Sequence, residues 1–503
     1  MMRSTTPLGP ARRPALLGID LGTSSVKAVV TDLHGTMIGH AVGSYPVLTP
    51  RPAWSETDPQ KWLLATAAAV RTAVSEAGAQ PVAIGFSGQM HGLVPTDAAG
   101  RPTRNAMLWS DARAVGELST YRRLPDRIRA RLANPLSPGM AGPMLAWLAA
   151  NETDVYAATR WALQPKDWLR AQLTGRFATE PSDASATLLY DIADDGWDGH
   201  VIDALGLDPT RLAPMLSSSA HPAGELTPEA ARLLDLRAGT PVAAGAADAA
   251  AAALGSRLVD PGTVQLTVGT GSQIVRPVTT LPTELPTAPV THLYRAATDK
   301  GWYAMGAGLN GGSTLAWVCR TLDASWQQLY ATAVGEPRQD DPFFLPHLHG
   351  ERTPYLDPDM RGAWIGLAPH HDRDHLLRAA LEGVAFAIRD ALEATLTPEN
   401  PAPHLRLAGG GTTDAGWRQM LADVLGQPIR AVEVSAASGL GAATLAARAA
   451  DLVDEDTALA RISATRPVAQ PGRDRPEIYS ARYGRYRELI RAIRRSGDRS
   501  PER

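Results

Sequence analysis

The sequence predicts an α/β protein built from two domains. The chain has 503 residues, which is more than a single hydrophobic core usually supports. Strand-like apolar runs alternate with helix-like segments in each half. A strand–turn–strand segment with a Gly-Thr turn returns about 250 residues after its first occurrence, which indicates an architectural duplication.

Composition excludes several classes of protein. Hydrophobic residues make up 44% and charged residues 20%, as in soluble globular chains. The formal charge of −3 provides no strong field for nucleic acid or an anionic membrane. The single cysteine, Cys319, excludes an internal disulfide framework and favours a cytoplasmic location. No apolar run of about 18 residues predicts a membrane span, and residues 1–14 read as a flexible leader.

The first predicted elements are three antiparallel strands. An apolar run reaches Asp20, a Gly-Thr-Ser-Ser turn follows, and two further runs cover Val26–Val30 and Thr36–Val42. A helix is predicted from Asp58 to Ala77, because Asp58 is a suitable N-cap before Pro59.

The next segments continue this pattern. The stretch VAIGFSGQMHGLVPTD predicts a strand, a turn and a second strand, and residues 112–175 predict mostly helix that ends at Gly175.

The second half repeats the scheme. Gly262–Val278 predicts a strand, a Gly-Thr-Gly turn and a strand. An amphipathic helix follows in DRDHLLRAALEGVAFAIRDALEAT, then a strand in HLRLAGGG and a helix from Trp417. A last helix is expected around Tyr483 to Arg495, with disordered residues after it.

Three glycine turns are candidate phosphate sites. Backbone N–H groups in tight turns form anion-binding concavities, although DLGTSS and GTGS are equally compatible with plain hairpins. Neither turn has the Rossmann or Walker spacing. The third, in AGGGTTDAGWRQM, precedes a helix and suits phosphate or an adenine face, while its Asp414 also suits an N-cap.

Asp248 and two groups of histidines are further candidates. Asp248 is the only charge in GAADAAAAALG and fits either a helix cap or a base that accepts a hydroxyl proton. Met90 and His91 occupy a turn between buried strands, where a lone histidine is more often structural. His371 and His375 have zinc-compatible spacing but lack a third ligand, so we interpret them as part of a solvated helical turn.

These segments, taken in order, resemble the FGGY carbohydrate kinases. The resemblance runs from about Gly18 to about Ala447 and includes GIDLGTSSVKAVVTD, GFSGQMHGLV, LWSDARA, PKDWLRAQLTG, SDASATLLYD, FFLPHLHGERTPYLDPDMRGAWIGL and GGGTTDAGWRQMLADVLGQPI. Within the family, QMHG and SDASATLLYD point to the xylulokinases. The resemblance implies two actin-like (ribonuclease H-like) domains around an interdomain cleft that binds ATP and a sugar.

The resemblance also implies roles for single residues. Asp248 would be the catalytic base and a sugar contact, Met90 and His91 would bind the sugar, and Asp20 would lie beside Mg²⁺. ATP and its phosphates would be bound by Gly22, Thr23, Ser24, Gly269, Thr270, Gly271, Gly410, Gly411 and Asp414. Two departures leave the sugar open, because Ala249 replaces an asparagine of relatives and Met144 replaces a lysine at or near the expected pocket.

The expected activity is ATP-dependent phosphorylation of D-xylulose to D-xylulose 5-phosphate. The alternatives are an FGGY kinase for another ketose or a polyol, and an actin-like ATPase without a sugar substrate. The expected organisation is a leader (1–14), an N-terminal kinase domain (15–255), a C-terminal kinase domain (256–452) and a helical tail (453–503). A homodimer stays an open expectation, since the sequence is silent on oligomeric state.

Overall fold

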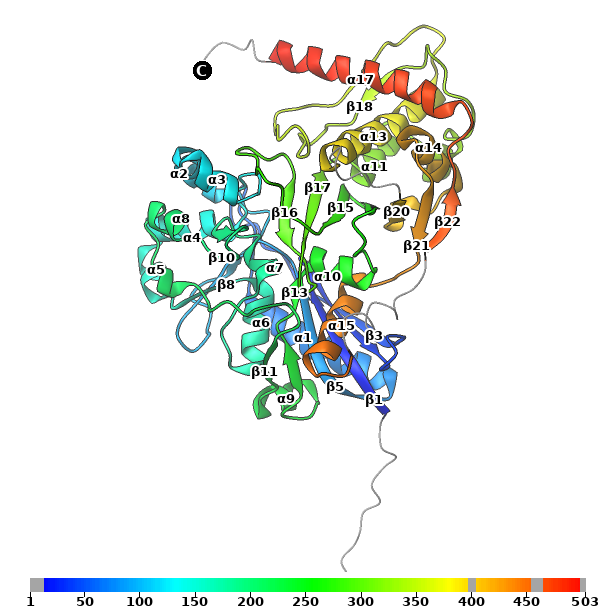
Figure 1. The fold of residues 1–503 in the computed structure, drawn as a ribbon. Helices are drawn as coiled ribbons and strands as arrows, with labels where there is room; N and C mark the ends of the chain where they lie inside the picture. Colours follow the sequence, from blue (N-terminus) through cyan, green and yellow to red (C-terminus); the bar gives the residue numbers. More distant parts are fainter. Residues whose placement is uncertain (1–12, 397–403, 454–464, 498–503) are drawn as a thin grey trace, which may run out of the picture.

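The computed structural model describes residues 13–396, 404–453 and 465–497 and contains two α/β units (Figure 1). In Figure 1 the first sheet lies below and the second above. The expectation of two α/β domains is confirmed. Most of the predicted leader and the predicted disordered end lie outside the described residues.

The first sheet has seven strands. Its main order is β11-β12-β5-β1-β2-β3, and β13 also pairs with β5. The strands are β1 (Arg13–Leu21), β2 (Ser25–Thr31), β3 (Met37–Ser44), β5 (Ala79–Gly88), β11 (Pro222–Glu225), β12 (Pro241–Ala243) and β13 (Ala246–Ala247). Strands β1, β12 and β13 run parallel to β5, whereas β1, β2 and β3 form an antiparallel meander. The three predicted N-terminal strands are therefore confirmed.

Helices cover both faces of the first sheet. The helix α1 (Pro59–Ala77) packs on β2 and β3, and α15 (Ala437–Ala449) packs on β1 and β5 although it comes late in the sequence. Glycines allow this approach: a Cβ at Gly18 would lie 2.0 Å from the Gly439 carbonyl oxygen, and one at Gly85 would lie 1.9 Å from that of Ala442. The sheet is thus buried on both faces, as the apolar run of β1 requires.

The second sheet repeats the arrangement of the first. Its order is β16-β17-β15-β14-β20-β21-β22. The strands are β14 (Thr263–Val268), β15 (Ser272–Val278), β16 (His292–Arg295), β17 (Trp302–Gly308), β20 (His404–Ala408), β21 (Ile429–Val432) and β22 (Thr465–Ala469). An antiparallel meander of β14, β15 and β17 is followed by the parallel strand β20, just as β1, β2 and β3 are joined by β5. The predicted architectural duplication is therefore confirmed.

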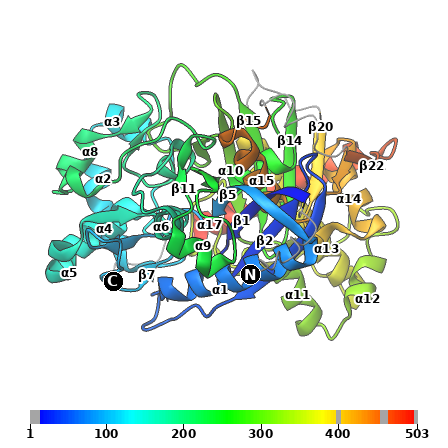
Figure 2. The same cartoon turned by 90° about the horizontal axis from the view of Figure 1, so that it is seen from below.

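Further elements complete the two units, and Figure 2 shows α2, α3, α4, α5 and α8 on the side away from the second sheet. In the first half the helices are α2 (Leu118–Arg123), α3 (Asp126–Arg131), α4 (Ala141–Asn151), α5 (Thr153–Ala158), α6 (Pro165–Thr174), α7 (Pro181–Ala184), α8 (Gly199–Ala204), α9 (Pro228–Leu234) and α10 (Asp248–Gly255). In the second half they are α11 (Gly312–Thr321), α12 (Trp326–Ala331), α13 (Arg373–Thr395), α14 (Ala415–Leu425) and α17 (Arg475–Gly497).

Short elements fill the connections. The paired strands are β4 (Glu56–Thr57) with β7 (Ala106–Met107), β6 (Val94–Thr96) with β8 (Trp161–Leu163), β9 (Tyr190–Asp191) with β10 (Gly196–Trp197), and β18 (Phe343–Leu345) with β19 (Ala363–Ile365). The 3₁₀ helices are η1 (Arg113–Glu117), η2 (Pro209–Arg211) and η3 (Gly410–Thr412). Among the described residues, no helix is both long and apolar enough to cross a bilayer.

Local signals predicted helix ends well. Asp58 accepts a hydrogen bond from the Gln60 N–H at the start of α1, and Gly175 ends α6 in the left-handed conformation. Residues 112–175 contain strand β8 as well as helices, so the prediction of mostly helix there misses a strand.

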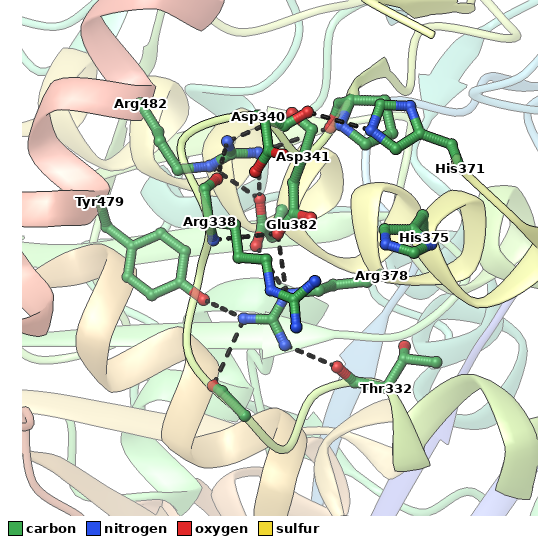
Figure 3. A network of polar contacts seen from close by, with 12 residues as sticks. Thr332, Arg338, Asp340, Asp341, His371, His375, Arg378, Glu382, Tyr479 and Arg482 are labelled. Carbon is green, nitrogen blue, oxygen red and sulfur yellow. Dashed lines mark hydrogen bonds and ion pairs between the residues drawn. The ribbon is translucent and has the colours of Figure 1, made fainter. Parts of the chain in front are cut away.

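The last helix is longer than predicted. It begins at Arg475 rather than near Tyr483, because its first two turns pack against α13 through the buried side chains of Tyr479 and Arg482 (Figure 3). Arg482 donates to Glu382 at 2.7 Å, and Glu382 also accepts from Arg378 at 3.1 Å. This buried ion-pair network fixes the tail to the second unit.

Candidate active site

Three parallel strands bring the candidate residues of the first half together. Asp20 of β1 and Ala246 of β13 both lie opposite Ser87 of the intervening strand β5. The chain segments that follow these positions therefore leave the same edge of the sheet, where α/β proteins bind ligands. They carry Gly22, Thr23 and Ser24 after β1, Met90 and His91 after β5, and Asp248 after β13.

Asp20 is a buried carboxylate beside a single lysine. Its Oδ1 accepts a hydrogen bond from the Ser87 hydroxyl at 3.0 Å, and its Oδ2 lies 3.7 Å from Lys27 Nζ. Burial raises the pKa of Asp20 above its usual range, although Lys27 and Ser87 oppose this. Lys27 lies opposite Asp20 on β2, and sequence reasoning did not single it out.

Asp248 is the first residue of α10 and does not cap it. Ala247 occupies the N-cap position, and Asp248 Oδ1 accepts only from the adjacent Ala249 N–H, at 2.7 Å. The interpretation as a helix cap is therefore wrong. Burial, and next the negative charge of Asp20, raise the pKa of Asp248 to about 7. Asp248 is thus a carboxyl group that takes up and releases its proton near neutral pH.

The first glycine turn is a tight hairpin that side chains of other segments contact through hydrogen bonds. The Gly22 N–H donates to the Ser25 carbonyl at 2.9 Å, and the Gly22 carbonyl accepts from the Tyr45 hydroxyl at 2.6 Å. The Trp109 indole N–H donates to the Thr23 hydroxyl at 3.0 Å. Within the described chain no hydrogen bond engages the N–H groups of Thr23 and Ser24. The hairpin interpretation is confirmed, and two turn amides remain available to a ligand.

Met90 and His91 lie at the same edge in an unusual conformation. His91 has a φ of +73°, which is rare outside glycine and common at functional sites. Its Nδ1 donates to the Ala186 carbonyl at 2.7 Å, and burial lowers its pKa to about 4. The imidazole is therefore neutral at pH 7, with Nε2 as a hydrogen-bond acceptor. Met90 Sδ accepts from the Tyr303 hydroxyl at 3.8 Å.

Strand β16 of the second unit contributes residues that the sequence did not reveal. His292 and Tyr294 have ring centres 6.4 Å and 6.0 Å from that of His91. His292 Nδ1 lies 3.0 Å from Asn134 Oδ1, which is an acceptor because the Asn134 amide nitrogen donates to two carbonyls. Burial lowers the pKa of His292 well below its ordinary value, so this imidazole is neutral too.

The candidate residues of the second half form a separate group of turns. The Gly312 N–H donates to the Gly269 carbonyl at 2.8 Å, and a Cβ at Gly409 would lie 2.4 Å from the Val268 carbonyl oxygen. The turn at residues 269–271 is thereby packed against the start of α11 and the loop that carries Gly410 and Gly411. No hydrogen bond within the described chain engages the N–H groups of Thr270 and Gly271.

Asp414 belongs to the same loop and is the N-cap of α14. Its carboxylate accepts from the Trp417 N–H at 2.9 Å and caps α14, as one of its two interpretations predicted. His375 likewise serves a helix start, because its Nδ1 lies 2.7 Å from the Asp372 carboxylate in the capping box of α13. This confirms the helical-turn interpretation of the histidines around residue 371.

A chain of contacts joins the two groups. A Cβ at Gly271 would lie 2.3 Å from the Gly308 carbonyl oxygen, and the next residue, Leu309, donates its N–H to Glu351 at 2.8 Å. Arg352 follows Glu351, and its guanidinium lies 5.6 Å from the ring centre of Trp109, which bonds Thr23. This series of contacts connects the two glycine turns through Arg352 and Trp109.

The two departures from the family pattern have different surroundings. Ala249 is buried in one apolar cluster with Met90, Tyr294 and Tyr303. Met144 is fully buried in another cluster, among the apolar side chains of the helical layer that includes α4. Met144 thus lies on the inner face of α4, within this apolar core.

The residues fit a magnesium–nucleotide ligand. Asp20 and Asp248 are close enough for one to raise the pKa of the other, and Lys27 is the cation that opposes both. Magnesium is usually held by one or two carboxylates together with phosphate oxygens. Open amides in two glycine turns suit phosphate. No group of three metal-ligating side chains occurs in the part of the chain that the structure describes.

Comparisons with known proteins agree with this arrangement. Residues 15–255 match the N-terminal domain, and residues 264–450 the C-terminal domain, of the FGGY family of carbohydrate kinases. The chain is 33% identical to the xylulose kinase of Escherichia coli strain K12 over 484 residues, 95% of this chain and 99% of that protein.

Two other relatives bear on the substrate. A crystal structure described as a xyloylose kinase from Brucella ovis is 34% identical, with a TM-score of 0.88 over 95% of this chain and 99% of that one. A gluconokinase of Bacillus subtilis strain 168 is 27% identical over 87% of this chain and 88% of that protein. The chain belongs to the FGGY carbohydrate kinases and is an actin-like, two-domain sugar kinase that transfers phosphate to an alcohol.

Proposed function

We propose that this enzyme transfers the γ-phosphoryl group of ATP to the 5-hydroxyl of D-xylulose. The observation that carries the proposal is the position of Asp248, beside Asp20 at the edge of three parallel strands and with a pKa raised to about 7. A general base works best when its pKa lies near the operating pH. The identity of the sugar rests on the relatives that are named xylulose kinases.

Asp248 would receive the proton of the acceptor. As the sugar oxygen forms its bond to the γ-phosphorus, the bond from that phosphorus to the β–γ bridging oxygen breaks, and the hydroxyl proton passes to the Asp248 carboxylate. In phosphoryl transfer such a carboxylate contributes largely by orienting the attacking hydroxyl.

Asp20 would hold Mg²⁺ on the phosphate side, where the ion neutralises charge on the transferred group. The amides of Thr23, Ser24, Thr270 and Gly271 would bind phosphate oxygens. We assign the adenosine to the loop of Gly410, Gly411 and Asp414, which adjoins the turn containing Gly269. Lys27 would add a positive charge next to the transferred group.

The acceptor would lie against Met90, His91 and His292. His91 Nδ1 donates to the Ala186 carbonyl, so its Nε2 can accept a hydrogen bond from a sugar hydroxyl. His292 Nδ1 lies 2.6 Å from the Tyr294 hydroxyl and 3.0 Å from Asn134 Oδ1, and the tautomer that donates to Asn134 leaves Nε2 of His292 as a second acceptor. Two such acceptors suit a neutral polyhydroxylated substrate. The side chain of Ala249 offers no polar contact, and this favours another ketose or a polyol as the alternative acceptor.

Sugar-dependent ADP release with Mg-ATP tests the proposal. The panel contains D-xylulose, other ketoses, polyols, gluconate and a reaction without sugar. We expect D-xylulose to give the highest kcat/KM. A stronger response to another sugar would overturn the substrate and keep the kinase, whereas ATP hydrolysis that ignores every sugar would support an actin-like ATPase.

A further inference from the structure

One short segment lies behind the proposed site and contacts both halves of it. It runs from Glu180 to Thr187, includes α7, and is almost entirely buried. The proposed mechanism assigns none of its side chains a role. Its sequence, EPSDASAT, contains the first six residues of the stretch SDASATLLYD.

The segment bonds the residue that precedes Asp248. The Ala247 N–H donates to the Ser182 hydroxyl at 3.0 Å. Strand β13, which ends at Ala247, pairs with β5 on one side, and no other strand pairs with it in the described chain. Ser182 therefore supplies the acceptor that a neighbouring strand would otherwise provide. It holds the backbone just before α10, which has no side-chain N-cap bond, while the Ser438 hydroxyl donates to the Asp248 carbonyl at 3.4 Å.

Ser182 is itself held in one orientation. Its hydroxyl donates to Glu180 Oε1 at 2.8 Å, so its oxygen lone pairs remain for the Ala247 N–H. The other carboxylate oxygen of Glu180 accepts from the Ser219 hydroxyl at 2.7 Å. Glu180 also caps α7 by accepting from the N–H groups of Ser182 and Asp183. The side chains of Glu180, Ser182 and Ser219 are all buried.

A fully buried ionic cluster anchors this arrangement. Lys166 Nζ lies 2.6 Å from Asp167, 3.4 Å from Asp183 and 3.5 Å from Glu180. Arg170 bonds Asp167 at 2.8 Å and the Ala244 carbonyl, just before β13, at 2.6 Å. Because moving a buried paired charge is costly, the cluster resists displacement of α7 and of the segment that leads to Asp248.

The far end of the segment contacts the acceptor residues. The Ala186 carbonyl accepts from His91 Nδ1. The Ser185 hydroxyl accepts from the Arg295 N–H of β16 at 3.0 Å, and the Ser185 carbonyl accepts from Asn134, the partner of His292. One rigid segment thereby fixes the spacing between Asp248 and the two imidazoles.

We propose that Ser182 is a positioning residue for Asp248: its hydroxyl, oriented by Glu180, fixes the Ala247 backbone and so places the carboxylate that receives the acceptor's proton. The proposal rests on the proposed function. A displacement of about 1 Å at a reacting group can cost about 100-fold in rate. Loss of this bond should therefore lower kcat while the nucleotide turns and the sugar contacts remain.

The test compares Ser182→Ala with Ser219→Ala. Both variants remove one hydrogen bond to Glu180, but only Ser182→Ala removes the acceptor of the Ala247 N–H. With D-xylulose and Mg-ATP we expect Ser182→Ala to lose about 10- to 100-fold in kcat, with both KM values within about threefold. Ser219→Ala should stay within about threefold in kcat, with a similar loss in Tm.

A second variant separates rate from stability. Ser182→Thr keeps the hydroxyl but adds a methyl group in a fully buried position, so it should lower Tm while kcat stays within about threefold of wild type. If Ser182→Ala does not fold, Ser182→Cys, which offers a weaker acceptor, replaces it with the same expectation for kcat.

Equal kcat losses in the Ser182→Ala and Ser219→Ala variants, or wild-type kcat in Ser182→Ala, would overturn the positioning role. A wild-type enzyme without any sugar-dependent ADP release would refute the proposed function instead, independently of the variants.

Discussion

Asp248→Asn should make the enzyme more stable and nearly inactive. Asparagine has almost the same shape as aspartate but cannot accept the hydroxyl proton. Loss of a general base typically costs about 100- to 10,000-fold in rate. We expect that loss in kcat with little change in the KM for ATP, because Asp248 lies on the acceptor side of the proposed site.

The gain in stability follows from the raised pKa. The difference between the ordinary value of 3.8 and about 7 corresponds to as much as about 4 kcal/mol against the ionised form. The side chain keeps partial contact with solvent, so water screens part of this energy and we expect about 1–2 kcal/mol.

The effect of Asp248 on the free energy of unfolding depends on pH. The folded state binds the Asp248 proton more tightly than the unfolded state, so this group lowers stability progressively as pH rises from about 4 to about 7. The advantage of Asp248→Asn over wild type should therefore be small near pH 4 and reach its full size above about pH 7. Activity of wild type should fall at acid pH, because protonated Asp248 cannot accept a proton.

Thermal unfolding without nucleotide or metal, between pH 5 and 8, measures the predicted change in stability. Coupled ADP release measures the predicted loss in kcat. Asp203→Asn, at an exposed position of α8, is the matched control and should change neither. An Asp248→Asn enzyme that retains most of its turnover, or whose Tm follows the wild-type pH profile, would refute the reasoning.

Three further predictions concern other parts of the structure. His292→Phe keeps an aromatic ring beside His91 but removes the acceptor nitrogen, so steady-state kinetics should show an increase of about tenfold in the sugar KM and no change in the ATP KM; an unchanged sugar KM would remove His292 from the site. Met144→Lys places a charge in the core of the helical layer and should lower the free energy of unfolding by about 3 kcal/mol or more. Met144→Leu should lower it by less than about 1.5 kcal/mol. Denaturant titration measures both values and distinguishes a loss of stability from an effect confined to the sugar KM. Arg482→Leu leaves Glu382 buried with one cation fewer and should lower the free energy of unfolding by about 3–5 kcal/mol in the same assay. The control Arg485→Leu, at an exposed ion pair, should lower it by about 0.5 kcal/mol. Equal losses in the two variants would contradict the importance of the buried network.

The sequence predicted best what short-range chemistry determines. The hairpin around Gly22, the cap at Asp58 and the helix end at Gly175 each depend on a few neighbouring residues. The convergence of Asp20, Met90 and Asp248 came from the family resemblance, since no local signal shows that β1, β5 and β13 lie side by side.

What the sequence did not predict depends on contacts between distant segments. Nothing near Ala437–Ala449 reveals that α15 covers the first sheet, although the close approach to Gly18 and Gly85 explains those glycines afterwards. His292 reaches His91 only because β16 forms the edge of the second sheet.

The most direct test of the central claim is a ³¹P NMR time course of Mg-ATP with D-xylulose and the wild-type enzyme, with Asp248→Asn as the comparison. We expect a sugar phosphomonoester coupled to the C5 protons, formed together with ADP, and its near absence with the variant. Release of inorganic phosphate without any sugar phosphate, or equal product from both enzymes, would contradict it.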